Sequence, residues 1–103
     1  MMFRQGDVLL VEVEAIPEGA QGVKRDEAGR IVLALGEATG HAHAIASPGA
    51  RLYAMGENRY LRVPKGGATL LHEEHAVIPL PPGGYRVVIQ REYSPEAVRR
   101  VQD

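Results

Sequence analysis

The sequence predicts an all-β fold, a small single-domain barrel or sandwich of about seven or eight short strands with one short C-terminal helix. Two observations predict this class. Short apolar runs, several of them alternating with polar residues, recur along the chain as they do in half-buried strands. Glycine and proline separate these runs at close intervals, with 12 Gly and 7 Pro among 103 residues. The length suits one domain, residues 1–103.

The first predicted strand is the apolar run at residues 7–14 (DVLLVEVE). Its end alternates, which predicts that Leu9, Val11 and Val13 face the core. Residues 17–30 then carry three glycines, a proline and several charges. This composition predicts a long surface loop with room for a short hairpin.

The remaining strands are predicted from runs rich in Val, Leu, Ile and Tyr. A turn at Gly56–Asn58 should join two of them as a hairpin, and residues 81–84 (PPGG) should form another turn. Pro79 has no N–H for a ladder, so its strand should be an edge. These strands are residues 30–35, 41–46, 51–55, 58–63, 68–72, 76–80 and 85–93.

Helix signals occur at the C-terminus. Ser94 suits an N-cap, Pro95 suits the first helical position, and Glu96 suits the positive end of the helix dipole. A short helix is therefore predicted there.

The composition argues against several classes of function. The formal net charge is −1 with both signs scattered along the chain, which argues against nucleic-acid binding. The absence of cysteine excludes disulfides, thiol catalysis and cysteine–zinc sites. The sequence has neither a signal peptide's apolar run nor a membrane-spanning segment, so a cytoplasmic location is expected.

The four histidines form two pairs, His41/His43 and His72/His75. On a strand, His41 and His43 would point to the same face, about 6–7 Å apart. The spacing in His72-Glu73-Glu74-His75 sends the second pair to opposite faces of a regular strand. A tight or helical turn would instead bring His72 and His75 together.

We therefore predict a mononuclear metal site built from His41, His43, His72 and His75, with Glu73 or Glu74 in reserve. Neutral imidazoles suit a divalent transition metal such as Zn, Fe, Ni or Mn. An open coordination position would allow the metal to activate water. Asp7, Glu37 and Glu57 are weaker candidate ligands. The role, structural or catalytic, stays open.

Two other interpretations of the histidines stay open. They could be ordinary turn and strand residues, with His72 to His75 an exposed charged turn. They could also form a pH switch, because clustered imidazoles repel one another once protonated.

Several segments resemble a group of short uncharacterised bacterial and phage proteins with paired histidines. The likeness extends over most of the chain and implies no activity. It rests on the segments GEATGHAH (36–43), LHEEH (71–75), PGGY (82–85) and QREY (90–93).

The H-x-H at His41 and His43, with a later histidine after residues 64–66 (PKG), is similar to the cupin pattern. That resemblance implies a small β-barrel with one metal held by His41, His43 and one of His72 or His75. The glutamate that cupins place shortly after this motif is missing here. The acidic ligand is therefore unassigned.

A fold alternative is chaperonin-10. Residues 7–14 look like its first strand, and residues 29–33 (GRIVL) after a glycine-rich loop are similar to its mobile loop. This resemblance implies a rival function, a non-enzymatic interaction module that docks an unidentified protein through the 17–30 loop or the C-terminal helix. An edge strand near Pro79 also makes a homodimer an expectation.

Overall fold

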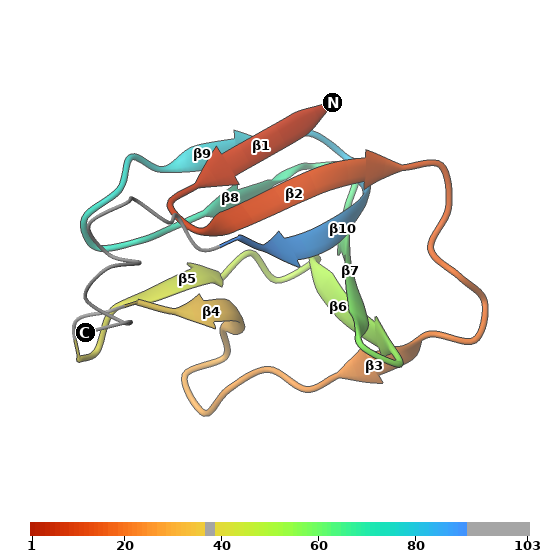
Figure 1. Cartoon of the computed structure of the whole chain (residues 1–103), viewed down its shortest axis with the longest axis horizontal. Helices are drawn as coiled ribbons and strands as arrows, with labels where there is room; N and C mark the ends of the chain where they lie inside the picture. The colour runs from red at the N-terminus through yellow and green to blue at the C-terminus, as the bar shows by residue number, and fades with distance from the viewer. Residues whose placement is uncertain (37–38, 91–103) are drawn as a thin grey trace, which may run out of the picture.

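A computed structural model describes residues 1–36 and 39–90, which form ten short strands and no helix (Figure 1). The all-β class is thereby confirmed. The helix predicted from Ser94 and the candidate ligand Glu37 lie outside the described residues. The strands are β1 (Met2–Gln5), β2 (Val8–Val13), β3 (Gln21–Val23), β4 (Ile31–Leu35), β5 (Ala42–Ile45), β6 (Arg51–Met55), β7 (Asn58–Val63), β8 (Ala68–Leu70), β9 (Ile78–Leu80) and β10 (Gly83–Ile89).

The strands form one six-stranded antiparallel sheet and two smaller pairs. The large sheet has the order β1-β2-β10-β7-β6-β3, and the pairs are β4–β5 and β8–β9. An isolated antiparallel bridge between Ala44 and Leu71 connects the two pairs. The described strands therefore do not close into a barrel, because the large sheet ends on β1 and β3. This open arrangement corrects the barrel form of the prediction and the strand count of seven or eight.

The core lies between the large sheet and the two pairs, and eight of the ten strands contribute to it. Its largest buried side chains come from all three sheets, so the sheets cannot separate without exposing apolar surface. The Tyr85 hydroxyl is satisfied by donating to the carbonyl of Pro81 at 2.7 Å. The fully buried members are Val8, Leu10, Leu33, Ile45, Leu61, Leu70 and Tyr85.

The prediction that Leu9, Val11 and Val13 of β2 face the core was wrong. Val8 and Leu10 are both fully buried and belong to the core, whereas Val11 and Val13 are only half-buried. The partner strand explains the register, because Leu10 lies directly opposite Val87 of β10, which also faces the core. Leu9 is buried as well, on the other face of the sheet.

Two strands, β1 and β3, were not predicted from the sequence, and β3 lies in the predicted loop. β1 pairs with β2, and β3 pairs with β6 inside the 17–30 segment. The predicted hairpin at Gly56 is confirmed, since Met55 pairs with Asn58. Strand β9, which carries Pro79, is paired with β8 on one side only, as expected for an edge.

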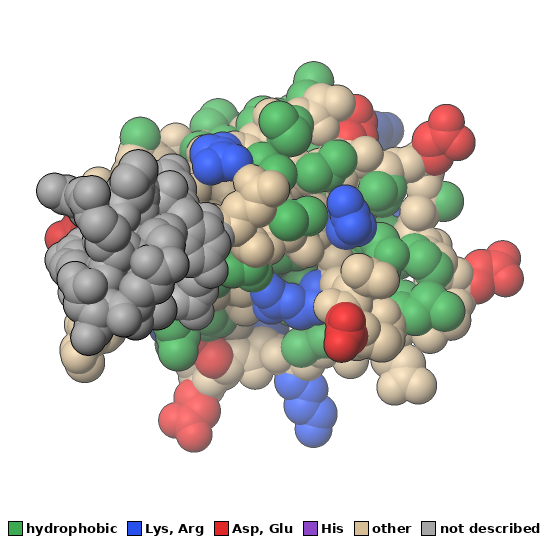
Figure 2. Space-filling view, viewed as in Figure 1, with side chains coloured by type: hydrophobic (Ala, Val, Ile, Leu, Met, Phe, Trp, Pro, Cys, Tyr) green, Lys and Arg blue, Asp and Glu red, His purple; other side chains and the backbone are tan. Residues whose placement is uncertain are grey.

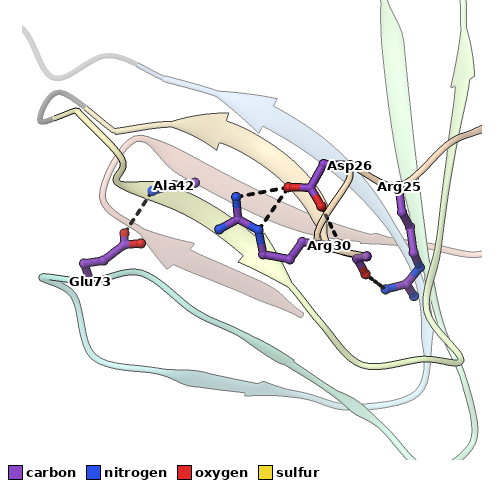
Figure 3. A network of polar contacts seen from close by, with 6 residues as sticks. Arg25, Asp26, Arg30, Ala42 and Glu73 are labelled. Atoms are coloured by element: carbon purple, nitrogen blue, oxygen red, sulfur yellow. Dashed lines mark hydrogen bonds and ion pairs between the residues drawn. The ribbon is translucent and has the colours of Figure 1, made fainter.

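The second half of the 17–30 segment is held by two charged side chains (Figure 3). The Arg25 guanidinium donates to the carbonyls of Gly29, Ser47 and Ala50 at 2.8, 2.6 and 2.7 Å. The backbone N–H of Arg30 donates to Asp26 at 2.7 Å, and this bond is the main reason the pKa of Asp26 lies below its ordinary value. The segment is thus anchored to the body of the domain. Docking of a partner through it stays a prediction.

Acidic and basic side chains are interspersed on the face shown in Figure 2. None of the described residues forms a helix with the length and hydrophobicity that a bilayer crossing requires.

Candidate metal centre

The bridge between β5 and the end of β8 brings the two histidine pairs together. Ala44 and Leu71 exchange two backbone hydrogen bonds of 3.0 and 2.8 Å. In an antiparallel ladder, the pair that follows such a bonded pair has no mutual hydrogen bonds and its side chains lie closer. That following pair is His43 and His72, whose ring centroids are 4.3 Å apart. Local strand pairing therefore places one histidine from each motif side by side, with the two rings tilted by 36°.

The turn after His72 adds the third histidine. The centroids of His72 and His75 lie 4.6 Å apart, and those of His43 and His75 lie 5.6 Å apart. The connection between β8 and β9 is irregular, so the spacing of three does not separate the two rings. Of the two arrangements left open by the sequence, the structure therefore has the one in which His72 and His75 converge.

One candidate ligand atom from each of His43, His72 and His75 lies within 4.8 Å of the other two. Imidazole nitrogens in a tetrahedral zinc site stand about 3.4 Å apart, given metal–nitrogen distances of about 2.0–2.1 Å. Side-chain rotations that draw the rings closer would bring the three atoms around one ion. Of the three, His43 is buried, His72 is half-buried and His75 is exposed.

The buried amide of Gln5 fixes the proton on His43. Gln5 Nε2 donates to the carbonyls of Leu70 at 3.2 Å and Ala76 at 3.0 Å. Because both amide hydrogens go to carbonyls, Gln5 Oε1 is the acceptor in its 2.9 Å bond with His43 Nδ1. His43 Nδ1 therefore carries the hydrogen, and the lone pair of the neutral ring lies on Nε2, where a metal can bind.

His72 holds the opposite tautomer. The backbone N–H of Glu74 donates to His72 Nδ1 at 3.0 Å, so the hydrogen of the neutral ring lies on Nε2. Coordination through Nε2 would move this hydrogen to Nδ1, and coordination through Nδ1 would occupy the accepting lone pair. A metal on His72 must in either case replace the bond from Glu74.

His41 and Glu73 form a second group around His72. One ligand atom from each of His41, His72 and Glu73 lies within 4.8 Å of the others. The Glu73 carboxylate, however, already accepts the backbone N–H of Ala42 at 2.9 Å (Figure 3). His41 Nδ1 is buried without a hydrogen-bond partner among the described residues, and the Glu74 carboxylate lies 3.8 Å from it.

A cavity of about 260 Å³ opens beside the first group. It has room for a water molecule or a small ligand next to the histidine rings. The tight β1–β2 turn forms one wall, where a Cβ added to Gly6 would lie 2.9 Å from His75 Nε2 and 3.0 Å from His43 Cε1. Its lining residues are Gly6, Asp7, Leu35, Gly36, His43, His72, Glu74 and His75.

Electrostatics favour a neutral His43. Burial is the main cause that holds the pKa of His43 below its ordinary value, and His72 and His75 act in the same direction. Asp7 and Glu73 oppose this effect. A neutral ring is the form that binds a metal, so His43 keeps its ligand form to lower pH than a free histidine. The pKa of Glu73 is lowered, mainly by the bond from Ala42.

The structure therefore gathers the predicted residues around His72 in two groups and adds residues that were not predicted. His41 precedes β5 and joins Glu73, whereas His43 joins His75. Asp7, a weak candidate, lines the cavity, and Glu57 lies in the β6–β7 turn. Gln5 and Gly6 were missed, because the contacts that bring the β1–β2 turn to the histidines join residues far apart in the sequence.

The comparisons with known proteins identify a family but no activity. The sequence pattern of a domain of unknown function, DUF8820, matches residues 4–90. This stretch includes every described residue of the histidine groups. No curated protein and no solved structure matches the chain.

Proposed function

The chain belongs to the DUF8820 family of unknown function, and we propose that it binds one divalent transition-metal ion through His43, His72 and His75. The observation that carries this proposal is the convergence of the three rings beside a cavity, with Nδ1 of His43 bonded to Gln5 and Nε2 left to bind a metal. Three neutral imidazoles suit zinc first, with iron, nickel and manganese as alternatives.

The group around His43 supports the proposal better than the group around His41. Its ligands are three imidazoles, and it borders the 260 Å³ cavity. The carboxylate of the other group is already engaged by the Ala42 N–H. His41 and Glu73 are therefore proposed to lie beside the centre and not in it.

The proposed centre leaves a coordination position open toward the cavity. Three protein ligands plus an open position are typical of zinc sites that bind water and lower its pKa. Among the described residues, Asp7 and Glu74 are the carboxylates that line the same cavity, where such a water would lie. Water activation is the chemistry that this arrangement favours. A reaction and its substrate do not follow from it.

Metal content tests the proposal directly. Untagged protein, purified without a nickel or cobalt column, should contain close to one equivalent of a transition metal or take up one equivalent of added zinc. His75→Ala should lose this binding, and because His75 is exposed the variant should still fold. His43→Ala should also lose it, with a lower melting temperature since His43 is buried.

His41→Ala separates the two histidine groups. Under the proposal, it keeps most of the zinc affinity, and Glu57→Gln, in a distant turn, keeps all of it. Loss of zinc in His41→Ala with retention in His75→Ala would move the centre to the other group. A wild-type protein that binds none of zinc, iron, nickel or manganese would overturn the proposal.

A further inference from the structure

Gln5 makes contact with both halves of the histidine site. It is 2% exposed and ends β1, immediately before the turn at Gly6. Its three amide hydrogen bonds reach three different parts of the chain, at Leu70, Ala76 and His43. Buried polar side chains with this degree of satisfaction specify one arrangement of their neighbours.

Two of these bonds hold the connection between β8 and β9. The acceptors, the carbonyls of Leu70 and Ala76, stand on either side of the segment that carries His72 and His75. One nitrogen thus ties together the start and the end of this segment. The third bond, from His43 Nδ1 to Gln5 Oε1, reaches β5.

We propose that Gln5 is a positioning residue for the metal centre, holding the His72–His75 segment against His43 and directing His43 to bind through Nε2. The positioning of metal ligands by Gln5 rests on the proposed function. The effect of Gln5 on the His43 tautomer does not depend on any metal. A metal-ligating histidine whose second nitrogen is held by an outer hydrogen-bond partner has a fixed ring orientation and a stronger ligand atom.

The two roles of Gln5 can be separated by two substitutions. Gln5→Met preserves much of the side-chain volume and removes all three bonds. Gln5→Glu, as a carboxylate, keeps an acceptor for His43 Nδ1–H but cannot donate to the carbonyls of Leu70 and Ala76. It should therefore keep the tautomer of His43 while releasing the His72–His75 segment.

The first readout is the ¹⁵N spectrum of the imidazoles in metal-free protein. Wild type and Gln5→Glu should show His43 protonated at Nδ1, and Gln5→Met should lose this preference. An unchanged His43 tautomer in Gln5→Met would overturn the assignment. Because no metal is present, this result stands whether or not the proposed metal site exists.

The second readout is zinc affinity by competition with a chelator of known strength. Loss of an outer hydrogen-bond partner weakens metal binding by about 10–100-fold, so Gln5→Met should lose that much. Gln5→Glu should lose less. Leu61→Ala leaves a cavity in the core at β7 and controls for general destabilisation. Below its melting temperature, this variant should bind zinc with wild-type affinity.

These outcomes distinguish the inference from the proposed function. Wild-type protein that fails to bind zinc defeats the proposed function, and the tautomer measurement still decides what Gln5 does. Wild-type protein that binds zinc while Gln5→Met binds it equally well defeats the positioning role alone. An affinity loss in Leu61→Ala equal to that in Gln5→Met would also defeat it.

Discussion

At the scale of single residues, Gly6 sets how closely the β1–β2 turn approaches the histidines. It follows Gln5 and adopts a φ of 57°, which favours glycine. A Cβ at this position would lie 2.9 Å from His75 Nε2, so any larger residue must displace that ring. The missing side chain therefore makes room for the rings of His43 and His75 as well as for the turn.

We predict that Gly6→Ala weakens zinc binding while Gly56→Ala does not. Gly56 is a matched control, because it also opens a two-residue hairpin turn, has a φ of 61° and has open space around a built Cβ. Both variants should lose about 1–2 kcal/mol of folding stability from the left-handed backbone. Only Gly6→Ala should lose about tenfold or more in zinc affinity by chelator competition. Equal affinities in the two variants would contradict the close approach of Gly6.

At the scale of elements, the site depends on where β5 meets the end of β8. The backbone ladder there consists of the Ala44–Leu71 bridge, and the Glu73 carboxylate extends it by accepting the N–H of Ala42. A side chain thus takes the place of a backbone carbonyl at the end of the ladder. This replacement fixes the start of the turn that carries His72 and His75.

We predict that Glu73 acts as an anchor of this turn and not as a metal ligand. Glu73→Gln keeps an oxygen acceptor for the Ala42 N–H, so it should keep most of the zinc affinity and most of the melting temperature. Glu73→Ala removes the acceptor and should lower both. Glu57→Ala is the control, since Glu57 lies in the β6–β7 turn and does not line the histidine cavity.

The alternative role of Glu73 gives a different pattern. A ligand carboxylate replaced by an amide would lose its charge and much of its affinity for a metal. Zinc binding that fails in Glu73→Gln as fully as in Glu73→Ala would therefore assign Glu73 to the centre. Isothermal titration of all three variants beside the wild type decides between the two roles.

The elements differ in how well local sequence predicts them. Strand β7 has the bounds that were predicted, residues 58–63, and β10 begins two residues before its predicted start, because composition and side-chain periodicity are local properties. The predicted end of the last strand, residues 91–93, lies outside the described residues. Strand β3 is short and exposed at all three residues, so it carries no such pattern. Its existence depends on pairing with β6, which is a long-range contact.

The candidate site was predictable in its residue types and not in its grouping. The paired spacing identified four histidines and the adjacent glutamates as chemically notable. Their division around His72 depends on the bridge between Ala44 and Leu71, and that pairing is invisible to local patterns. Gln5 was missed for the same reason, since a lone glutamine in a polar stretch gives no signal of burial.

At the scale of the whole molecule, the proposed centre connects all three sheets. Gly6 and Gln5 belong to the β1–β2 hairpin of the large sheet, His43 to β4–β5, and His72 and His75 to the connection of β8–β9. The Arg59 guanidinium makes a similar connection by donating from β7 to the Leu33 carbonyl of β4 at 2.6 Å. A domain of 103 residues has a small core, so such connections matter for its stability.

We predict that zinc stabilises the folded chain by an amount that grows with the logarithm of its free concentration relative to the dissociation constant. Free zinc at 100 times that constant should add about 2.7 kcal/mol, because the unfolded chain does not hold the three rings together. For a domain of this size, 1 kcal/mol corresponds to about 4–8 °C, so the melting temperature should rise by about 10–20 °C. The rise should shrink as the solution is made acidic, since zinc must then displace a proton from His43, whose pKa is held below its ordinary value by burial. Calorimetry with and without chelator measures it, and His75→Ala serves as the binding-deficient control. A wild-type melting temperature that zinc leaves unchanged, or an equal rise in His75→Ala, would mean that the three rings do not share an ion and that their contact serves packing alone.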